Sequence, residues 1–207
     1  GRMELTIDGN TFIDVVNAIL TTHGSQSSLD FDIINNTTRT VLPNSTVQIN
    51  VNRAGSVAFG APGSFTGTVA NNVVGVEGVP NSGSVSGDGI SVQSNGSGGT
   101  TRVTVRNNTV RVFDSRGIYL RAADTKLGGY GTPRFEVRVQ DNDIGGFGDW
   151  ATDGIHIQMG ALGTDDTFIC LDIRGNSIAG AKANGIRFRT GGTPRLLPWS
   201  PSRSGTA

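Results

Sequence analysis

The fold is decided by the stretch Thr101-Arg-Val-Thr-Val-Arg-Asn-Asn-Thr-Val110, which alternates apolar and polar residues, reaches a pair of asparagines and then resumes. Asn108, the second of that pair, has a counterpart in each of the remaining repeats of the chain. The counterparts are Asn10, Asn36, Asn72, Asn142 and Asn176. Successive asparagines of this set are separated by 26, 36, 36, 34 and 34 residues. A repeat of that length with a strand pattern on both sides is typical of a solenoid, in which each repeat forms one coil.

Two families of strands are expected in each repeat. Three, five and seven residues before each asparagine the side chains are apolar, and only Gly67 and Thr101 depart from this among eighteen positions. Alternation with a period of two turns one face of the strand inward. The second family begins with a Gly-Ile pair, whose glycine is expected to permit the bend into the strand. These pairs are Gly89-Ile90, Gly117-Ile118, Gly154-Ile155 and Gly185-Ile186.

Strands that pair with their equivalents one repeat later must be parallel, and the connections are too short for helical crossovers. Parallel connections are right-handed in nearly all proteins. The sequence therefore predicts an all-β fold, a right-handed parallel β-helix (solenoid) of about six coils, over residues 1–190. Residues 191–207 contain three prolines that interrupt strands, so a C-terminal cap or a disordered tail is expected there.

The six asparagines are expected to form a structural ladder. An asparagine tolerates left-handed backbone angles, and equivalent residues of stacked coils lie about 4.8 Å apart. At that spacing their amides can hydrogen-bond to one another and satisfy polar groups inside the core. On the outer face of the strand before each asparagine, the same stacking predicts that Arg102 lies beside Glu136 and Arg138 beside Asp172.

The repeated Asn-x-[Ile/Val/Phe] and Gly-Ile motifs, and the final repeat from Cys170 to Gly180, resemble those of the right-handed parallel β-helix superfamily, the pectate-lyase-like group. Among its members they are most similar to large bacterial secreted or cell-surface proteins. The resemblance implies a location outside the cell and often contact with polysaccharide. Some members of the superfamily are lyases, glycosidases or epimerases, and many others are adhesins.

Composition narrows the range of partners. The chain has 17 basic and 17 acidic residues, so no net field favours nucleic acid. No run of eighteen apolar residues is present, and membrane insertion by a helix is not expected. The single cysteine, Cys170, excludes an internal disulfide framework. Because strand pattern begins at Met3 without a cap, end-to-end contact with more β-helix or with another subunit is expected.

The outer face of the Gly-Ile strands contains the candidate ligand-binding residues. Alternation places them with Ser91 and Gln93 in one surface file, where they could contact an extended polysaccharide, and arginines favour carboxylates. A solvated sheet face without a ligand is the alternative interpretation. The candidates are Tyr119, Arg121, His156, Gln158, Arg187 and Arg189.

No catalytic residue and no cofactor are assigned from the sequence. Calcium binding through Asp141, Asp143 and Asp153 is an open alternative, although aspartate is also an ordinary turn residue. The favoured function is a non-catalytic β-helix module of a secreted or surface protein, which binds glycan or another surface or acts as a spacer. The alternative is a polysaccharide lyase or glycosidase acting on an acidic polysaccharide, with Asp143 and Asp153 working together with His156 or Arg121.

Overall fold

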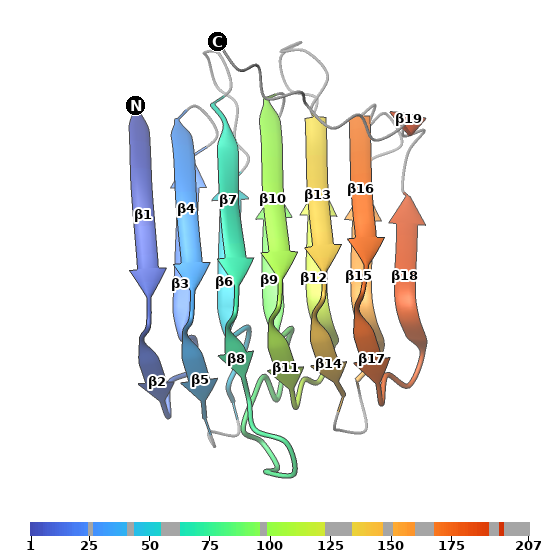
Figure 1. The fold of residues 1–207 in the computed structure, drawn as a ribbon. Coiled ribbons are helices and arrows are strands. Elements are labelled where there is room, and N and C mark those ends of the chain that lie inside the picture. Colours follow the sequence, from blue (N-terminus) through green and yellow to red (C-terminus); the bar gives the residue numbers. More distant parts are fainter. Residues whose placement is uncertain are drawn as a thin grey trace.

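The computed structural model of the chain describes residues 1–24, 27–40, 44–54, 63–95, 99–122, 134–146, 151–159, 168–190 and 195–196. In these residues the chain forms strands and turns, without a helix. The strands stack into a parallel β-helix (Figure 1). The predicted all-β parallel solenoid is confirmed.

Three parallel sheets run along the solenoid, with seven, six and six strands in the described residues. Sheet A contains β1 (Arg2–Asp8), β4 (Ser28–Ile34), β7 (Phe65–Ala70), β10 (Thr100–Arg106), β13 (Arg134–Gln140), β16 (Phe168–Arg174) and β19 (Arg195–Leu196). Sheet B contains the short strands β2 (Thr11–Ile13), β5 (Thr37–Arg39), β8 (Val73–Val74), β11 (Thr109–Arg111), β14 (Asp143–Gly145) and β17 (Ser177–Ala179). Sheet C contains β3 (Ile19–Gly24), β6 (Ile49–Ala54), β9 (Ile90–Ser94), β12 (Arg116–Ala122), β15 (Asp153–Met159) and β18 (Asn184–Thr190).

The path of the chain can be followed in Figure 1. It runs down the front sheet and up the rear sheet while it advances from β1 towards β18, which is a right-handed coil. The two-residue strand β19 pairs with β16 and extends sheet A. The rest of the 191–207 segment, for which a cap or a disordered tail is predicted, lies outside the described residues.

The core is a column of apolar side chains from all three sheets. Both exceptions to the apolar pattern have a structural reason. A Cβ on Gly67 would lie 2.5 Å from two ring carbons of Phe31, so the phenylalanine ring fills the space that a side chain would need. Thr101 is buried, and its hydroxyl donates to the Ser94 hydroxyl at 2.8 Å.

The asparagine ladder is present as predicted. Each Nδ2 donates to the Oδ1 of the next asparagine at 2.8–3.1 Å, from Asn10 through to Asn176. Each backbone N–H of the set, except that of Asn176, also donates to the next Oδ1 at 3.0 Å. The four internal members are at most 1 % exposed, so the ladder supplies partners to polar groups that water does not reach.

The ladder asparagines themselves do not adopt the left-handed backbone conformation that the sequence predicts for them. It belongs to the residue before each ladder asparagine, with φ between 54° and 68°. Glycine, asparagine and aspartate tolerate that region best, which explains why the ladder asparagine is preceded by one of these three types. The residues are Gly9, Asn35, Asn71, Asn107, Asp141 and Gly175.

Three of the four glycines of the Gly-Ile pairs are needed for space, whereas a Cβ on Gly185 would meet no atom within 4 Å. A Cβ on Gly117 would lie 2.4 Å from Cγ2 of Ile144 and 2.7 Å from the carbonyl oxygen of Gly154. Gly89 and Gly154 stand in the same relation to side chains of sheet B. None of the three has a positive φ, so close approach between sheets C and B, and not the predicted bend, demands glycine there.

The outer face of sheet A mixes acidic and basic side chains. Arg102 pairs with Glu136 at 2.8 Å, as predicted. Arg138 faces Asp172 in the register of β13 and β16, also as predicted. Although burial raises the pKa of Glu136, contact with Arg102 and Arg134 outweighs that effect and lowers it overall. This face therefore has its charges largely compensated.

Candidate functional site

Two rows of side chains cover the outer face of sheet C, and they contain every ligand-binding candidate. The strand registers align one residue per coil in each row. The first row is Leu20, Asn50, Ser91, Tyr119, His156 and Arg187. The second row is Thr22, Asn52, Gln93, Arg121, Gln158 and Arg189. The predicted surface file is thus two neighbouring rows, which continue into β6 and β3.

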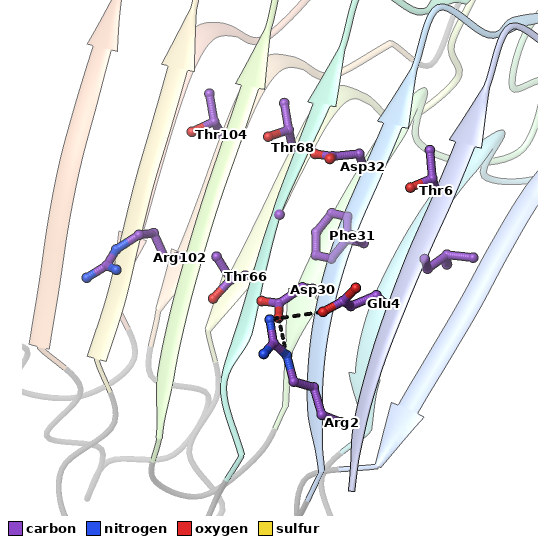
Figure 2. Close-up of a pocket in the computed structure, with 12 residues that line it drawn as sticks. Arg2, Glu4, Thr6, Asp30, Phe31, Asp32, Thr66, Thr68, Arg102 and Thr104 are labelled. Carbon is purple, nitrogen blue, oxygen red and sulfur yellow. Dashed lines mark hydrogen bonds and ion pairs between the residues drawn. The ribbon is translucent and has the colours of Figure 1, made fainter.

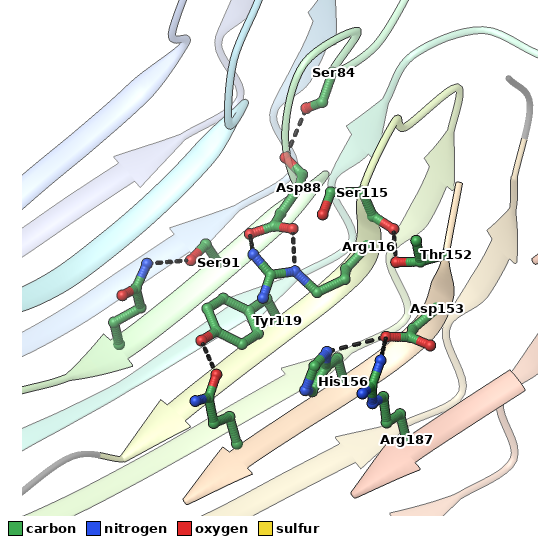
Figure 3. A network of polar contacts seen from close by, with 12 residues as sticks. Ser84, Asp88, Ser91, Ser115, Arg116, Tyr119, Thr152, Asp153, His156 and Arg187 are labelled. Carbon is green, nitrogen blue, oxygen red and sulfur yellow. Dashed lines mark hydrogen bonds and ion pairs between the residues drawn. The ribbon is translucent and has the colours of Figure 1, made fainter. Parts of the chain in front are cut away.

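The middle of the first row is buried. Ser91, Tyr119 and His156 are 0 %, 5 % and 6 % exposed. The Arg116 guanidinium carbon lies 3.5 Å from the centre of the Tyr119 ring, and the His156 ring meets that ring edge-on at 5.5 Å (Figure 3). These contacts occupy the ring surfaces that could otherwise stack on a sugar. Tyr119 and His156 therefore support the face, and they are not the accessible contacts that alternation suggests.

Arg116 is held in place by a buried carboxylate. It donates from Nε and Nη2 to the two oxygens of Asp88 at 2.6 and 3.0 Å. Asp88 is 3 % exposed, and the Ser84 hydroxyl donates to its backbone carbonyl at 2.6 Å. Burial raises the pKa of Asp88, and the neighbouring Arg116 charge opposes that rise. Asp88 thus holds the Arg116 guanidinium over the Tyr119 ring, where the two make a cation–π contact.

Asp153 orients the histidine of the first row. Its carboxylate lies 3.0 Å from Nδ1 of His156 and 3.7 Å from an Nη of Arg187, and it accepts from the Asn184 amide at 2.6 Å. Because Nδ1 donates to the carboxylate, Nε2 is left as an acceptor, and it has no partner among the described residues. Burial lowers the pKa of His156, Asp153 opposes this, and Arg116 and Arg187 lower it further. The imidazole is accordingly neutral at pH 7.

Sequence reasoning missed Asp88 and Arg116 as members of the site. Both occupy the position before glycine in successive Gly-Ile pairs, and Arg116 pairs in register with Asp153 of the next coil. The order Asp88, Arg116, Asp153 alternates in charge from coil to coil. That alternation was a usable signal, because stacked positions of opposite charge stabilise each other.

The second row is the accessible part of the face. Arg189 is exposed, and Arg121 and Gln158 are half-buried. Neither arginine has an ion pair within the described ranges, and no acidic residue stands in either row. Arg121 also has a buried Nε–H without a partner in that part of the chain. Gln158 accepts at Oε1 from the Tyr119 hydroxyl at 2.7 Å, which leaves its Nε2 as the free donor.

The three aspartates of the calcium alternative do not come together. Asp141 lies in the turn between β13 and β14, and Asp143 lies in sheet B, where it pairs with Arg111 at 2.5 Å. Asp153 lies in sheet C and contacts His156. Within the described residues no group of three or more His, Cys, Asp or Glu side chains is placed to hold a metal ion. The same separation removes Asp143 from any joint role with Asp153.

A shallow depression of about 390 Å³ lies on the outer face of sheet A (Figure 2). Short side chains, Thr66, Thr68 and Thr104, leave this space open over β7 and β10. At one end Arg2 pairs with Asp30 at 2.8 Å and with Glu4 at 3.1 Å. One arginine does not balance the two carboxylates, and Asp32 also lines the depression, which therefore has an acidic end, unlike the second row of sheet C.

The part of the chain that the structure describes contains no helix long and apolar enough to cross a membrane. No protein-family model, curated protein or solved structure matches this sequence.

Proposed function

We propose that the chain is a non-catalytic β-helix module that binds an extended acidic polysaccharide along the second row of sheet C and Arg187. One observation carries the proposal. In a chain with equal numbers of acidic and basic residues, both rows on the outer face of sheet C lack acidic residues and hold three arginines. Two of the three, Arg121 and Arg189, have no ion pair among the described residues, and such guanidinium groups form strong bidentate bonds with carboxylates and sulfates.

The shape of the face favours a polymer over a compact ligand. The accessible groups lie one per coil, about 4.8 Å apart, in a line along the solenoid axis. Amides at Asn52, Gln93 and Gln158 alternate with or flank the arginines, and amides suit sugar hydroxyls. The balanced total charge argues against nucleic acid. The motif resemblance to bacterial secreted and surface proteins supports a location outside the cell.

End-to-end contact with more β-helix or with another subunit belongs to the same proposal. Ile186 and Phe188 occupy inward positions of β18, and they are 51 % and 44 % exposed. These apolar side chains would be covered by a further coil. The module would then also act as a spacer within a longer fibre.

The binding proposal is tested with immobilised polysaccharides, acidic and neutral, at low and moderate salt. The variant Arg121→Gln/Arg189→Gln should lose most binding to the acidic polymers. Its matched control is Arg39→Gln/Arg106→Gln, which removes the same charge from exposed arginines of sheets B and A. Equal loss in both double variants, or equal binding of neutral polymers by the unmodified protein, would contradict the proposal.

A second candidate, a polysaccharide lyase or glycosidase, is favoured by the contact between Asp153 and His156. A buried carboxylate that orients a neutral imidazole is a common arrangement for a general base. Incubation with uronate polymers should then release new unsaturated or reducing ends, and His156→Gln should abolish the release. If the unmodified protein releases no such ends, the enzyme candidate fails and the binding function remains.

A further inference from the structure

The second row has a charge pattern that repeats every second coil. From β9 to β18 it reads Gln93, Arg121, Gln158 and Arg189, and each neighbouring pair is aligned by the strand register. Neighbouring strands lie about 4.8 Å apart, so the two arginines lie roughly 10 Å apart, with a neutral side chain between them. A ligand that pairs with both arginines must present its anionic groups at that spacing.

The neutral position between the arginines is fixed by the buried first row. The Tyr119 hydroxyl donates to Oε1 of Gln158 at 2.7 Å, and Tyr119 is itself covered by Arg116 at 3.5 Å. Arg116 is in turn held by two hydrogen bonds to Asp88. Gln158 therefore offers one oriented NH2 group, whose N–H donors suit a hydroxyl or carbonyl oxygen of an uncharged sugar.

The second-row residues nearer the N-terminus are also uncharged and polar. Gln93 donates from Nε2 to the Ser91 hydroxyl at 2.9 Å, which leaves its Oε1 as an acceptor. Asn52 follows in register, without a charge. Charged contacts are thus confined to two alternate coils, and polar neutral contacts stand on either side of Arg121.

We infer that the preferred ligand is a polysaccharide with an anionic group on every second sugar residue, and that Gln158 determines this periodicity by facing the uncharged residue. This inference rests on the proposed function. A sugar in an extended chain advances by about one strand spacing, so one sugar faces each coil. A polymer charged on every residue would place a carboxylate against Gln158, where a neutral amide replaces the cation that would pair with it.

The sharpest test conserves the charge of the protein. The variant Gln158→Arg/Arg189→Gln keeps two arginines in the row but brings them onto adjacent coils. Calorimetry would measure the affinity of the unmodified protein and of this variant for hyaluronan oligosaccharides, which carry one carboxylate per disaccharide, and for oligogalacturonates of equal length, which carry one per residue. A neutral dextran oligosaccharide would be the blank.

The expected result is an approximately tenfold loss of affinity for the hyaluronan oligosaccharide in the variant, about the difference that one well-placed interaction makes. The oligogalacturonate should bind the variant at least as well as it binds the unmodified protein, because its carboxylates fit either spacing. Retained oligogalacturonate binding also shows that the variant is folded.

Other outcomes distinguish a wrong charge periodicity from a wrong binding function. If the variant binds hyaluronan within twofold of the unmodified protein, the periodicity is wrong and charge alone governs binding. Equal loss of both ligands would also contradict the periodicity, because the oligogalacturonate fits either spacing of the arginines. If the unmodified protein binds neither acidic oligosaccharide above the dextran blank, the proposed function itself fails.

Discussion

Replacing Asn108 with alanine tests the inside of the solenoid. The Asn108 side chain lies at the centre of the ladder and is 1 % exposed. Its Nδ2 donates to the Val69 carbonyl and to Oδ1 of Asn142, each at 2.9 Å. Its Oδ1 accepts from the backbone N–H and from Nδ2 of Asn72, each at 3.0 Å. Alanine removes all four hydrogen bonds at once.

The expected cost follows from which partners are left without a bond. Nδ2 of Asn72 keeps its bond to the Ile33 carbonyl, and Oδ1 of Asn142 keeps the bond from the backbone N–H of residue 108. The backbone N–H of Asn72 and the Val69 carbonyl lose the bonds that the side chain made. Each buried polar group without a partner costs about 1–3 kcal/mol, so the variant should lose about 2–6 kcal/mol of unfolding free energy.

The chain supplies its own control at the end of the ladder. Asn10 is exposed, and its Nδ2 donates to the Asp8 carbonyl and to Oδ1 of Asn36. Water can replace those bonds, and the Asn10 backbone N–H still donates to Asn36, so Asn10→Ala should cost under about 1 kcal/mol. Urea unfolding followed by circular dichroism, with linear extrapolation to water, measures both losses. Similar losses for the two variants would refute the view that the buried amides stabilise the core by satisfying backbone groups.

Three further predictions concern packing, pH and salt. Gly117→Ala should destabilise by about 1–3 kcal/mol because the added Cβ meets a sheet B methyl at 2.4 Å, whereas Gly185→Ala, with nothing within 4 Å, should cost less than half as much in the same urea experiment. Because burial lowers the pKa of His156, the unfolded chain binds this proton and the folded chain does not. The unfolding free energy should therefore fall as the pH drops below about 6.5, and His156→Gln should flatten that part of the curve. Binding of acidic polysaccharide should weaken with rising salt, and Arg121→Gln/Arg189→Gln should make that dependence shallower; an unchanged slope would count against direct ion pairing.

The architecture could be predicted from the sequence because every coil of a solenoid repeats the same local sequence pattern. Alternation before Asn108 fixes which side chains point inward, and one asparagine at the same place in each repeat fixes the register of the stacked coils, although the repeats differ in length. The exceptions could not be read in the same way. Gly67 is explained by the Phe31 ring in the neighbouring coil, and the left-handed turn residue is known only from the backbone angles.

The candidate site was predictable only in part. Alternation identified the file that contains Arg121 and Arg189, but it treats all outward positions as equally accessible. Accessibility depends on contacts between coils, and Arg116, the first residue of β12, covers Tyr119 although alternation gives it the parity of the inward residues Ile118 and Leu120. The burial of His156 depends on the same cluster. Which long polar side chains contact each other depends on three-dimensional packing, and the alternation of residues along a strand gives no information about it.

The same strand spacing governs both the ladder inside and the rows outside. Inside, it brings amides to hydrogen-bonding distance, so nearly every ladder position must remain asparagine. Outside, the same spacing places one second-row side chain on each coil, and these side chains lie on the outer face of sheet C, away from the apolar column. Exchange of Gln158 and Arg189 would therefore change the charge period of the face while the ladder and the core keep the coils in register. A solenoid can in this way vary the polymer that it recognises without altering its architecture.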